Sequence, residues 1–451
     1  MVSKFKYSHE VNKSGPQRKY SIAPTRIGPK KKIAFVCSGG GSKTGAFHLG
    51  VALALPEQGF RLFGGIAQPA QPAESPLSSI HIPKPMEIST YVGSSAGSII
   101  TTYLAAGYSL DNIFNSFLGQ KPTDPRDAIP KVLTKLTYQK MFRLRPSLAK
   151  EQLSQIMRVR TLLSKLLEGN LDALFHLDWV KIKGIFSTSG IEEYMRKEVL
   201  PSNRFQDYLA DLFVVATQLN HSRKVVFGKY NYQPPPHDLT CQYNNDVSIS
   251  EACAASTALP FIFAPFAIKN KNDKPVYYID GEIRETLSTH VAIDAGADLV
   301  IASYTHQPYH FLKDVGSLTD YGLPSILIQS IYLLIEQKIN NHIHNKKVQR
   351  NAIQAVDRFC KQEKLPDSQR QRIIEILEAE LHHRQEVDSI YIHPSPADAQ
   401  MFFGQHFSLS SKTLSEIVKS GFRAAIEAIK HYDFADRKEE THPMVSQSQV
   451  S

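Results

Sequence analysis

Residues 88–107 read ISTYVGSSAGSIITTYLAAG, in which a G-x-S-x-G motif at 93–97 separates two different apolar patterns. The preceding residues, 88–92, are rich in β-branched and aromatic side chains, as is typical of a strand. Apolar residues then recur at helical spacing over 99–104. A sharp turn from strand to helix would lift Ser95, at the centre of the motif, out of the sheet and aim its hydroxyl at the helix N-terminus. The stretch therefore predicts an α/β fold with a nucleophilic serine at a strand end.

A second strand-turn-helix pattern begins at residue 33. The apolar run 33–36 is typical of a buried strand, glycines dominate residues 38–45, and apolar residues continue to Pro56. Glycines let backbone N–H groups converge, and the dipole of a following helix favours negative charge there. Three interpretations stay open: a phosphate loop, an oxyanion hole for the serine, and a purely structural turn. The nucleotide motifs fit poorly, because G-x-x-x-x-G-K-[ST] is absent and G-x-G-x-x-G lacks its last glycine.

No histidine is an obvious proton acceptor for the serine. His48 lies inside the helical stretch after the glycines, His290 follows polar residues, and the others lie in polar or helical stretches. Each is more typical of a solvated surface histidine than of a base. Asp280 has a better context, because it follows the apolar strand 276–279 and precedes a glycine. Ligand sites in open α/β sheets cluster at such strand ends, although an aspartate there also serves as a turn former.

These motifs together resemble those of the patatin-like phospholipases, lipid acyl hydrolases with a Ser-Asp dyad and no catalytic histidine. The family's glycine-rich loop with a following Arg or Lys matches 39–43, its G-x-S-x-G motif matches 93–97, and its Asp-Gly motif matches 280–281. Residues 255–265 are similar to the family's S-x-A-x-P-x-x-F-x-P stretch. Residues 294–300 are similar to the start of the strand that follows. The likeness runs in patches from about residue 31 to 432.

The resemblance implies a three-layer α/β/α domain with a mostly parallel central sheet and large helical insertions. It implies that Asp280 accepts the proton of Ser95, whose oxygen attacks an ester carbonyl, and that water then hydrolyses the acyl-enzyme. The oxyanion hole is expected at Gly39, Gly40, Gly41, Ser42 and Lys43. No metal or organic cofactor is implied. The expected activity is phospholipase A-type cleavage of glycerophospholipids; the alternatives are a neutral-lipid lipase, a thioesterase, or an inactive membrane-binding module.

Two departures from the family pattern bear on this site. Thr44 stands between Lys43 and Gly45, so one extra residue lies at the expected oxyanion hole. Glu282 stands two residues after Asp280, where the family has a small residue. If its carboxyl points inward it raises the pKa of Asp280; otherwise it is solvated. Lys43 likewise has two interpretations, as a residue that stabilises the loop or a nearby charge and as a solvated surface lysine.

Composition places the chain among globular proteins. Hydrophobic residues make up 42% and charged residues 21% of its 451 residues, which are ordinary proportions. No apolar stretch approaches the ~20 residues of a membrane span, and the polar start lacks the apolar segment of a secretory signal. The four cysteines form no CxxC pair and no disulfide framework, which predicts a reducing compartment. We therefore expect a cytoplasmic or peripheral membrane protein.

Positive charge gathers in two segments. Residues 1–32 carry nine Lys or Arg against one Glu, and so do residues 131–165. The second segment has apolar residues at helical spacing, Tyr138, Met141 and Phe142, which suits an anionic lipid surface. The alternative is a solvated helical face packed on the core. Nucleic acid is not an expected partner, because no zinc-finger spacing or RNP-type aromatic motif accompanies the charge.

The organisation follows from these segments. We predict a basic flexible arm at 1–30, a catalytic core at 31–323 with a loop insertion at 64–85 and a helical cap at 119–205, a helical insertion at 324–386, a strand and helix that complete the core at 387–435, and a disordered tail at 436–451. Further strands are predicted at 212–216, 225–227 and 387–392, and a final helix at 413–432. The alternating charges of 324–386 suit either a solvent-exposed insertion or an oligomer contact.

Overall fold

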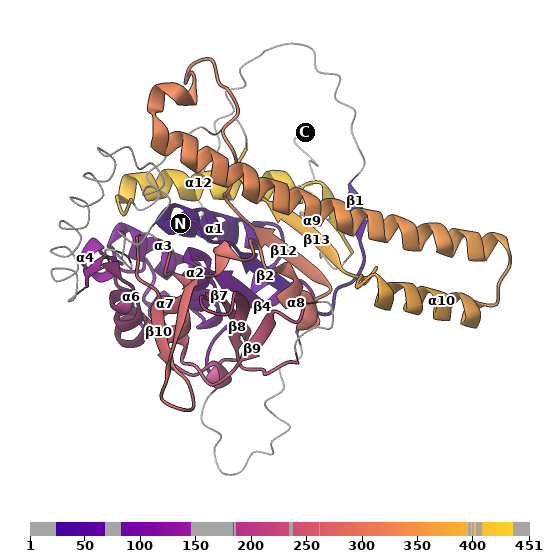
Figure 1. Cartoon of the computed structure of the whole chain (residues 1–451), viewed down its shortest axis with the longest axis horizontal. Coiled ribbons are helices and arrows are strands. Elements are labelled where there is room, and N and C mark those ends of the chain that lie inside the picture. Colours follow the sequence, from indigo (N-terminus) through magenta and orange to yellow (C-terminus); the bar gives the residue numbers. More distant parts are fainter. Residues whose placement is uncertain are drawn as a thin grey trace, which may run out of the picture.

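A computed structural model describes residues 24–67, 83–145, 184, 186–233, 238–260, 262–395, 398, 401–402 and 408–435. In this part of the chain a ten-stranded, mostly parallel sheet lies at the centre of the molecule (Figure 1). Helices pack on both of its faces, which gives three α/β/α layers. The predicted fold class is confirmed.

Five parallel strands form the middle of the sheet, in the order β13, β12, β2, β4, β7. Their bounds are Ile33–Cys37 for β2, Glu87–Ser94 for β4, Asp211–Gln218 for β7, Leu299–Ser303 for β12 and Asp388–Ile392 for β13. Every residue of β2 and β12 is buried. Burial on both faces explains why these strands are apolar runs without polar alternation.

Four strands extend the sheet beyond β7, with antiparallel pairing except between β8 and β9. β8 (Arg223–Gly228) lies along one edge of β7, and β9 (Cys241–Asn244) pairs with β8. β11 (Pro275–Asp280) also pairs with β7, and β10 (Phe266–Lys269) pairs with β11. Over residues 216–218, one edge of β7 pairs with β8. β11 therefore pairs with the opposite edge of β7, which is the edge that also pairs with β4.

Alternate residues of the central strands face two separate cores. On one face, Phe35 and Tyr91 belong to a large core that includes residues of α1, α2, α7 and α12. On the other, Val36 and Val92 lie in a smaller core with residues of α8 and α9. The helix bounds are Gly41–Glu57 (α1), Ala96–Ala105 (α2), Leu110–Leu118 (α3), Ser189–Tyr194 (α6), Ile249–Ser256 (α7), Thr289–Asp294 (α8), Leu323–Gln362 (α9) and Ser411–Ile429 (α12).

Close packing of α12 against α1 ties the C-terminal part of the chain to the core. A Cβ on Gly50 would lie 2.0 Å from the Val418 carbonyl oxygen, and one on Gly421 would lie 2.1 Å from the Phe47 carbonyl oxygen. Only glycine at both positions lets the two backbones approach this closely. The predicted helix at 413–432 is therefore part of the main fold, and it lies against α1 in Figure 1.

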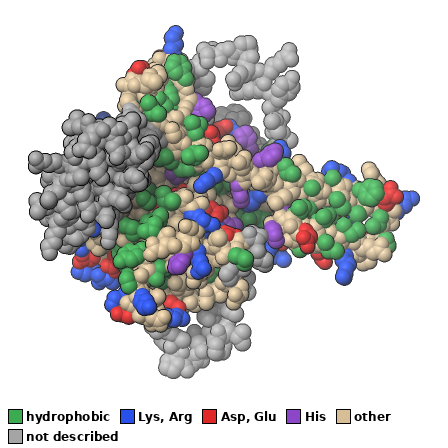
Figure 2. Space-filling view, in the orientation of Figure 1, with side chains coloured by type: hydrophobic (Ala, Val, Ile, Leu, Met, Phe, Trp, Pro, Cys, Tyr) green, Lys and Arg blue, Asp and Glu red, His purple; other side chains and the backbone are tan. Residues whose placement is uncertain are grey.

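The predicted helical segment 324–386 forms a hairpin of α9 and α10 (Asp367–Glu380) that projects from the body (Figure 1). Ile353, Cys360 and Ile374 are buried, whereas Phe359 and Ile376 are exposed. Figure 2 shows hydrophobic side chains along this hairpin. An oligomer contact through it stays a prediction. Among the described helices, none combines the length and apolar character needed to cross a membrane.

Shorter elements complete the described chain. They are β1 (Thr25–Ile27), β3 (Arg61–Leu62), α4 (Tyr138–Met141), β5 (Arg143–Leu144), β6 (Phe186–Ser187) and β14 (Tyr432–Phe434). β1 pairs with β14, so the last residues of the predicted arm belong to the folded body. The rest of that arm, the tail at 436–451, and much of the predicted insertion at 64–85 and cap at 119–205 lie outside the described residues.

Candidate active site

Ser95 occupies a strained turn between β4 and α2. Its φ of 48° and ψ of −126° are unusual for a residue with a side chain, and such strain concentrates at functional sites. The flanking glycines are required by close contacts: a Cβ on Gly93 would lie 2.3 Å from Thr101 Oγ1, and one on Gly97 would lie 2.4 Å from the Cys37 carbonyl oxygen. The predicted strand, turn and helix are therefore present around the serine.

Ser256 braces this turn. Its hydroxyl accepts a hydrogen bond from the Ser95 backbone N–H at 2.8 Å and donates one to the Val215 carbonyl at 2.6 Å. The sequence indicated Ser256 only as the first residue of the S-x-A-x-P stretch. Its bracing role could not be predicted, because it depends on α7 ending beside β7.

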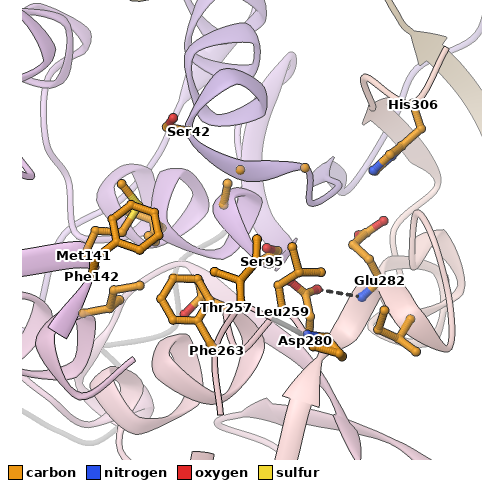
Figure 3. Close-up of a pocket in the computed structure, with 18 of the residues that line it drawn as sticks. Ser42, Ser95, Met141, Phe142, Thr257, Leu259, Phe263, Asp280, Glu282 and His306 are labelled. Carbon is orange, nitrogen blue, oxygen red and sulfur yellow. Dashed lines mark hydrogen bonds between the residues drawn. The ribbon is translucent and has the colours of Figure 1, made fainter. Parts of the chain in front are cut away.

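Asp280 is the last residue of β11 and is buried. Its carboxyl accepts a hydrogen bond from the Glu282 backbone N–H at 3.0 Å, and the Ser95 side chain interacts favourably with the ionised carboxyl. Burial raises the pKa of Asp280 to about 6, and these two interactions oppose the increase. The structure thus brings Ser95 and Asp280 together in one pocket (Figure 3).

The glycine-rich turn lies directly over the serine. A Cβ on Gly39 would lie 2.6 Å from Ser95 Cβ, so no larger residue fits there. Gly40 and Gly41 have φ of 132° and 78°, values that favour glycine. Helix α1 begins at Gly41, and its first residues, Gly41 and Ser42, line the pocket. The N-terminus of a 17-residue helix therefore faces the pocket, an arrangement that favours an anion.

The start of α1 corrects two expectations for the loop. Apolar spacing placed the helix after Gly45, but Lys43 and Thr44 already lie in its first turns and are fully buried. The surface interpretation of Lys43 is wrong: its Nζ donates to the Met401 carbonyl at 2.5 Å. Burial lowers the pKa of Lys43 to about 7, opposed by the charge of Asp398. The extra residue, Thr44, is accommodated in the helix with its hydroxyl 2.6 Å from that of Thr305.

His48 is also buried and not solvated as expected. Its Nε2 lies 2.9 Å from the Ser38 carbonyl, which can only accept, so Nε2 carries the proton. Its Nδ1 lies 2.7 Å from Ser303 Oγ. Burial lowers the pKa of His48 to about 4, which keeps the ring neutral at pH 7. Through these two contacts the neutral ring links α1 to the end of β12 and to the glycine turn.

Two other histidines, His290 and His306, differ in their position relative to the pocket. His290 Nδ1 lies 3.0 Å from a Glu285 carboxyl oxygen, and His290 is not among the residues that line the pocket. His306, which no sequence motif indicates, is buried, lines the pocket and packs edge-on against Tyr332. It follows β12 by a few residues, and only the folded sheet brings that segment beside the glycine turn.

The pocket is a cavity of about 820 Å³, within the usual range for ligand sites. Its polar groups gather around Ser95, Asp280 and Glu282, while the remaining wall is mainly apolar. The apolar residues include Ile99, Leu136, Tyr138, Met141, Phe142, Ile191, Leu259, Ile262, Phe263, Ile328, Ile331, Tyr332 and Ile335. Figure 3 shows Met141, Phe142 and Phe263 gathered on one side of Ser95. Such a wall suits an aliphatic ligand.

This cavity changes the interpretation of the basic segment 131–165. The apolar set expected on a lipid surface, Tyr138, Met141 and Phe142, lines the pocket instead. Each described basic residue of the segment bonds to another part of the chain: Lys131, Lys135, Lys140, Arg143 and Arg145. Residues 146–165 lie outside the described part, so membrane attraction through them stays a prediction.

Glu282 points inward, which resolves the alternatives left by the sequence. Its carboxyl is buried, lines the pocket and accepts a hydrogen bond from Ser94 Oγ. Burial is the largest cause that raises the pKa of Glu282, to about 8, and the nearby charge of Asp280 adds to it. Contrary to the expectation, burial and not Glu282 is the cause that raises the pKa of Asp280.

No metal centre accompanies these groups in the described residues. Within the ranges that the structure describes, no three His, Cys, Asp or Glu side chains are placed to hold a metal ion. A buried carboxylate beside a serine hydroxyl can remove its proton, and the N–H groups of a helix N-terminus can stabilise a developing oxyanion.

Comparison with known proteins agrees with this geometry. The family model "Patatin-like phospholipase" matches residues 35–293, which include the glycine turn, Ser95 and Asp280. None of the curated proteins matches the chain. Since the matched residues make up more than half of its length, the chain belongs to the patatin-like phospholipase family of lipid acyl hydrolases.

Proposed function

We propose that the protein is a phospholipase A-type serine hydrolase that cleaves fatty acyl esters of glycerophospholipids. Ser95 is the nucleophile and Asp280 is the base. The observation that carries the proposal is that these two side chains line one pocket beneath the N-terminus of α1, where Ser95 stabilises the ionised Asp280 carboxyl. A serine hydroxyl needs such an adjacent base to attack an ester.

The reaction proceeds in two halves. Asp280 takes the proton of Ser95 as the serine oxygen attacks the ester carbonyl, and it returns the proton to the departing alcohol. This leaves an acyl-enzyme on Ser95. Water then attacks the acyl carbonyl, again with Asp280 as base. The bond between the acyl group and Ser95 breaks, Asp280 returns the proton to the Ser95 oxygen, and the fatty acid departs. With a pKa of about 6, Asp280 is mostly ionised at pH 7 and remains basic enough for this role.

Backbone amides at the start of α1 form the oxyanion hole. Gly40, Gly41 and Ser42 line the pocket, and Gly39 lies against Ser95. One oxyanion-hole donor typically contributes about 3–4 kcal/mol to transition-state stabilisation. The Lys43 side chain is not among these donors, since it points to Met401; it positions the first turn of α1.

Apolar surface around the cavity supports a lipid substrate. The first part of α9 lines the cavity with Ile328 and Ile335, while Leu333 and Leu334 on the same helix are exposed. Figure 2 shows hydrophobic side chains where α9 begins, above the body. An acyl chain that leaves a bilayer would pass from this surface into the cavity without losing apolar contact. We therefore propose peripheral attachment to membranes, with 119–205 as a cap over the cavity.

Hydrolysis assays with the Ser95→Ala variant test this function. The wild type should release fatty acid from glycerophospholipid vesicles, and Ser95→Ala should not. A panel that includes triacylglycerols and acyl thioesters separates phospholipase activity from the alternatives, a neutral-lipid lipase and a thioesterase. If the wild type hydrolyses no acyl ester but binds vesicles, the protein is a membrane-binding module and the proposal is wrong.

A further inference from the structure

Glu282 lies within the proposed catalytic site and has no part in the dyad. It belongs to the short 3-10 helix Gly281–Ile283 that follows Asp280. A Cβ built on Gly39 would lie 2.4 Å from Glu282 Cγ and 2.6 Å from Ser95 Cβ. The Glu282 side chain and the serine therefore lie against the same face of the glycine turn, where an oxyanion would form. Figure 3 shows Glu282 beside Asp280 in the pocket.

The two carboxyl oxygens of Glu282 have different surroundings. Oε1 accepts a hydrogen bond from Ser94 Oγ. The backbone N–H of Gly39 also interacts favourably with the carboxylate. Oε2 is buried and has no hydrogen-bond partner within the described ranges. A buried polar atom without a partner is costly unless something else satisfies it.

The charges near Glu282 favour its neutral form. Asp280 on β11 and Glu285 after the 3-10 helix are both acidic and raise the pKa of Glu282. His306, after β12, lines the same pocket. On α1, the Lys43 side chain points to Met401 and His48 is held neutral by burial, and neither is among the groups that shift the pKa of Glu282. Burial is the largest cause of the raised pKa, about 8, so most of the population is protonated at pH 7.

Protonation makes the two oxygens chemically distinct. The oxygen that accepts from Ser94 is the carbonyl oxygen, and the proton then resides on Oε2, which has no acceptor among the described groups. Glu282 lines the pocket, and this hydroxyl is a hydrogen-bond donor without a partner among the described residues. A neutral carboxylic acid kept in an apolar site can donate to a developing oxyanion.

We propose that Glu282 is a further catalytic residue, whose protonated carboxyl donates a hydrogen bond from Oε2 to the oxyanion formed when Ser95 attacks the ester. The inference rests on the proposed function. The proton stays on Glu282 throughout, while the proton of Ser95 travels through Asp280. Ionised Glu282 would place a negative charge beside the oxyanion, so ionisation abolishes the effect.

Kinetics as a function of pH test the proposal on the full chain. With a soluble acyl ester as substrate, kcat and KM are measured from pH 5 to 10 for the wild type, Glu282→Gln, Glu282→Ala and Ser94→Ala. Thermal unfolding of each variant checks that it is folded. We expect the wild-type kcat to fall as pH rises through about 8. Glu282→Ala should lose about 10²–10³-fold in kcat with little change in KM.

The isosteric variant and the neighbouring serine sharpen the test. Glu282→Gln keeps a neutral donor, so its kcat at pH 7 should exceed that of Glu282→Ala at least ~10-fold, and its decline at alkaline pH should vanish. Ser94→Ala should move the decline to higher pH, because the Ser94 hydrogen bond lowers the pKa of Glu282. An unchanged alkaline decline in Glu282→Gln, no alkaline decline in the wild type, or full kcat in Glu282→Ala would overturn the proposal.

If the proposed Ser95–Asp280 dyad is wrong, the same hydrolysis assays give a different result. If Ser95→Ala hydrolyses the same ester as fast as the wild type, the proposed function is wrong whatever Glu282 does. If Ser95→Ala is inactive and the Glu282 variants behave as the wild type, only the role of Glu282 is rejected.

Discussion

Ser94 and Asp280 pair with two consecutive residues of β7, Ser94 with Val215 and Asp280 with Ala216, on the same edge of that strand. Their own strands, β4 and β11, run in opposite directions along that edge and meet at their carboxyl ends. Ser95 follows Ser94 by one residue, and the elbow turns it toward the end of β11. The backbone register of β7 thus fixes the distance between the two proposed catalytic groups, even though they lie far apart in the sequence.

The first prediction concerns Asp280→Asn. Asparagine keeps the shape of the side chain but cannot take a proton, so kcat for ester hydrolysis should fall by about 10²–10⁴-fold. In the wild type, kcat/KM should decline as pH falls through about 6, because protonated Asp280 is no longer a base. Stopped-flow or steady-state assays from pH 4 to 8 measure both effects. A wild-type rate that is flat from pH 4 to 8 would exclude Asp280 as the base.

The second prediction concerns Gly97→Ala. The added Cβ would lie 2.4 Å from the Cys37 carbonyl oxygen, so β2 or the elbow must shift. We expect a loss of about 1–3 kcal/mol in the free energy of unfolding, together with reduced activity. Gly28→Ala is a matched control, because its Cβ would have nothing within 4 Å. Urea unfolding compares the two, and equal stability of both variants would show that the elbow is looser than described.

The third prediction concerns Lys43→Met and pH. Burial lowers the pKa of Lys43 to about 7, so between pH 7 and about 10 the unfolded chain binds more protons than the folded one. Because of Lys43, the free energy of unfolding should therefore increase as pH rises through this window. The cost of Lys43→Met in the free energy of unfolding should be larger at pH 9 than at pH 6. The exposed Lys347→Met is the control, and a cost for Lys43→Met that does not change with pH would contradict the buried position.

The fourth prediction concerns the exposed start of α9. Replacing Leu333 and Leu334 with serine should weaken binding to phospholipid vesicles in sedimentation assays, because both side chains are exposed on the helix that lines the cavity. Hydrolysis of a soluble ester should change much less. Val348→Ser, an exposed apolar position farther along α9, is the matched control. Loss of vesicle binding in Val348→Ser alone would indicate that the membrane contact lies on the hairpin of α9 and α10.

The same vesicle sedimentation assay also tests electrostatic attraction to the membrane. The basic segments 1–32 and 131–165 predict tighter binding to anionic than to neutral vesicles. Equal binding to both would leave apolar contact as the basis of attachment.

Much of the site could be predicted because its signals are local. The strand-turn-helix pattern around Ser95 and the glycines before α1 each depend on neighbouring residues, and both are present. The apolar strand before Asp280 predicts a carboxylate at a strand end. It does not predict that β11 runs antiparallel to β7, and only the pairing register brings Asp280 to the serine.

The missed features all depend on contacts distant in sequence. Lys43 and His48 are polar residues that are usually exposed, yet in the fold Lys43 bonds to Met401 and His48 contacts Ser303. The inward orientation of Glu282 depends on Ser94 and on the absence of a side chain at Gly39. Ser256 acts through the backbone of β4 and β7. Spacing and composition carry no information about such partners.

The most direct test of the central claim is covalent labelling with a fluorophosphonate, followed by mass spectrometry of the labelled peptide. We predict one adduct on Ser95 in the wild type, much slower labelling of Asp280→Asn, and no labelling of Ser95→Ala. Equal labelling of Ser95→Ala, or an adduct on another serine of the wild type, would contradict the account.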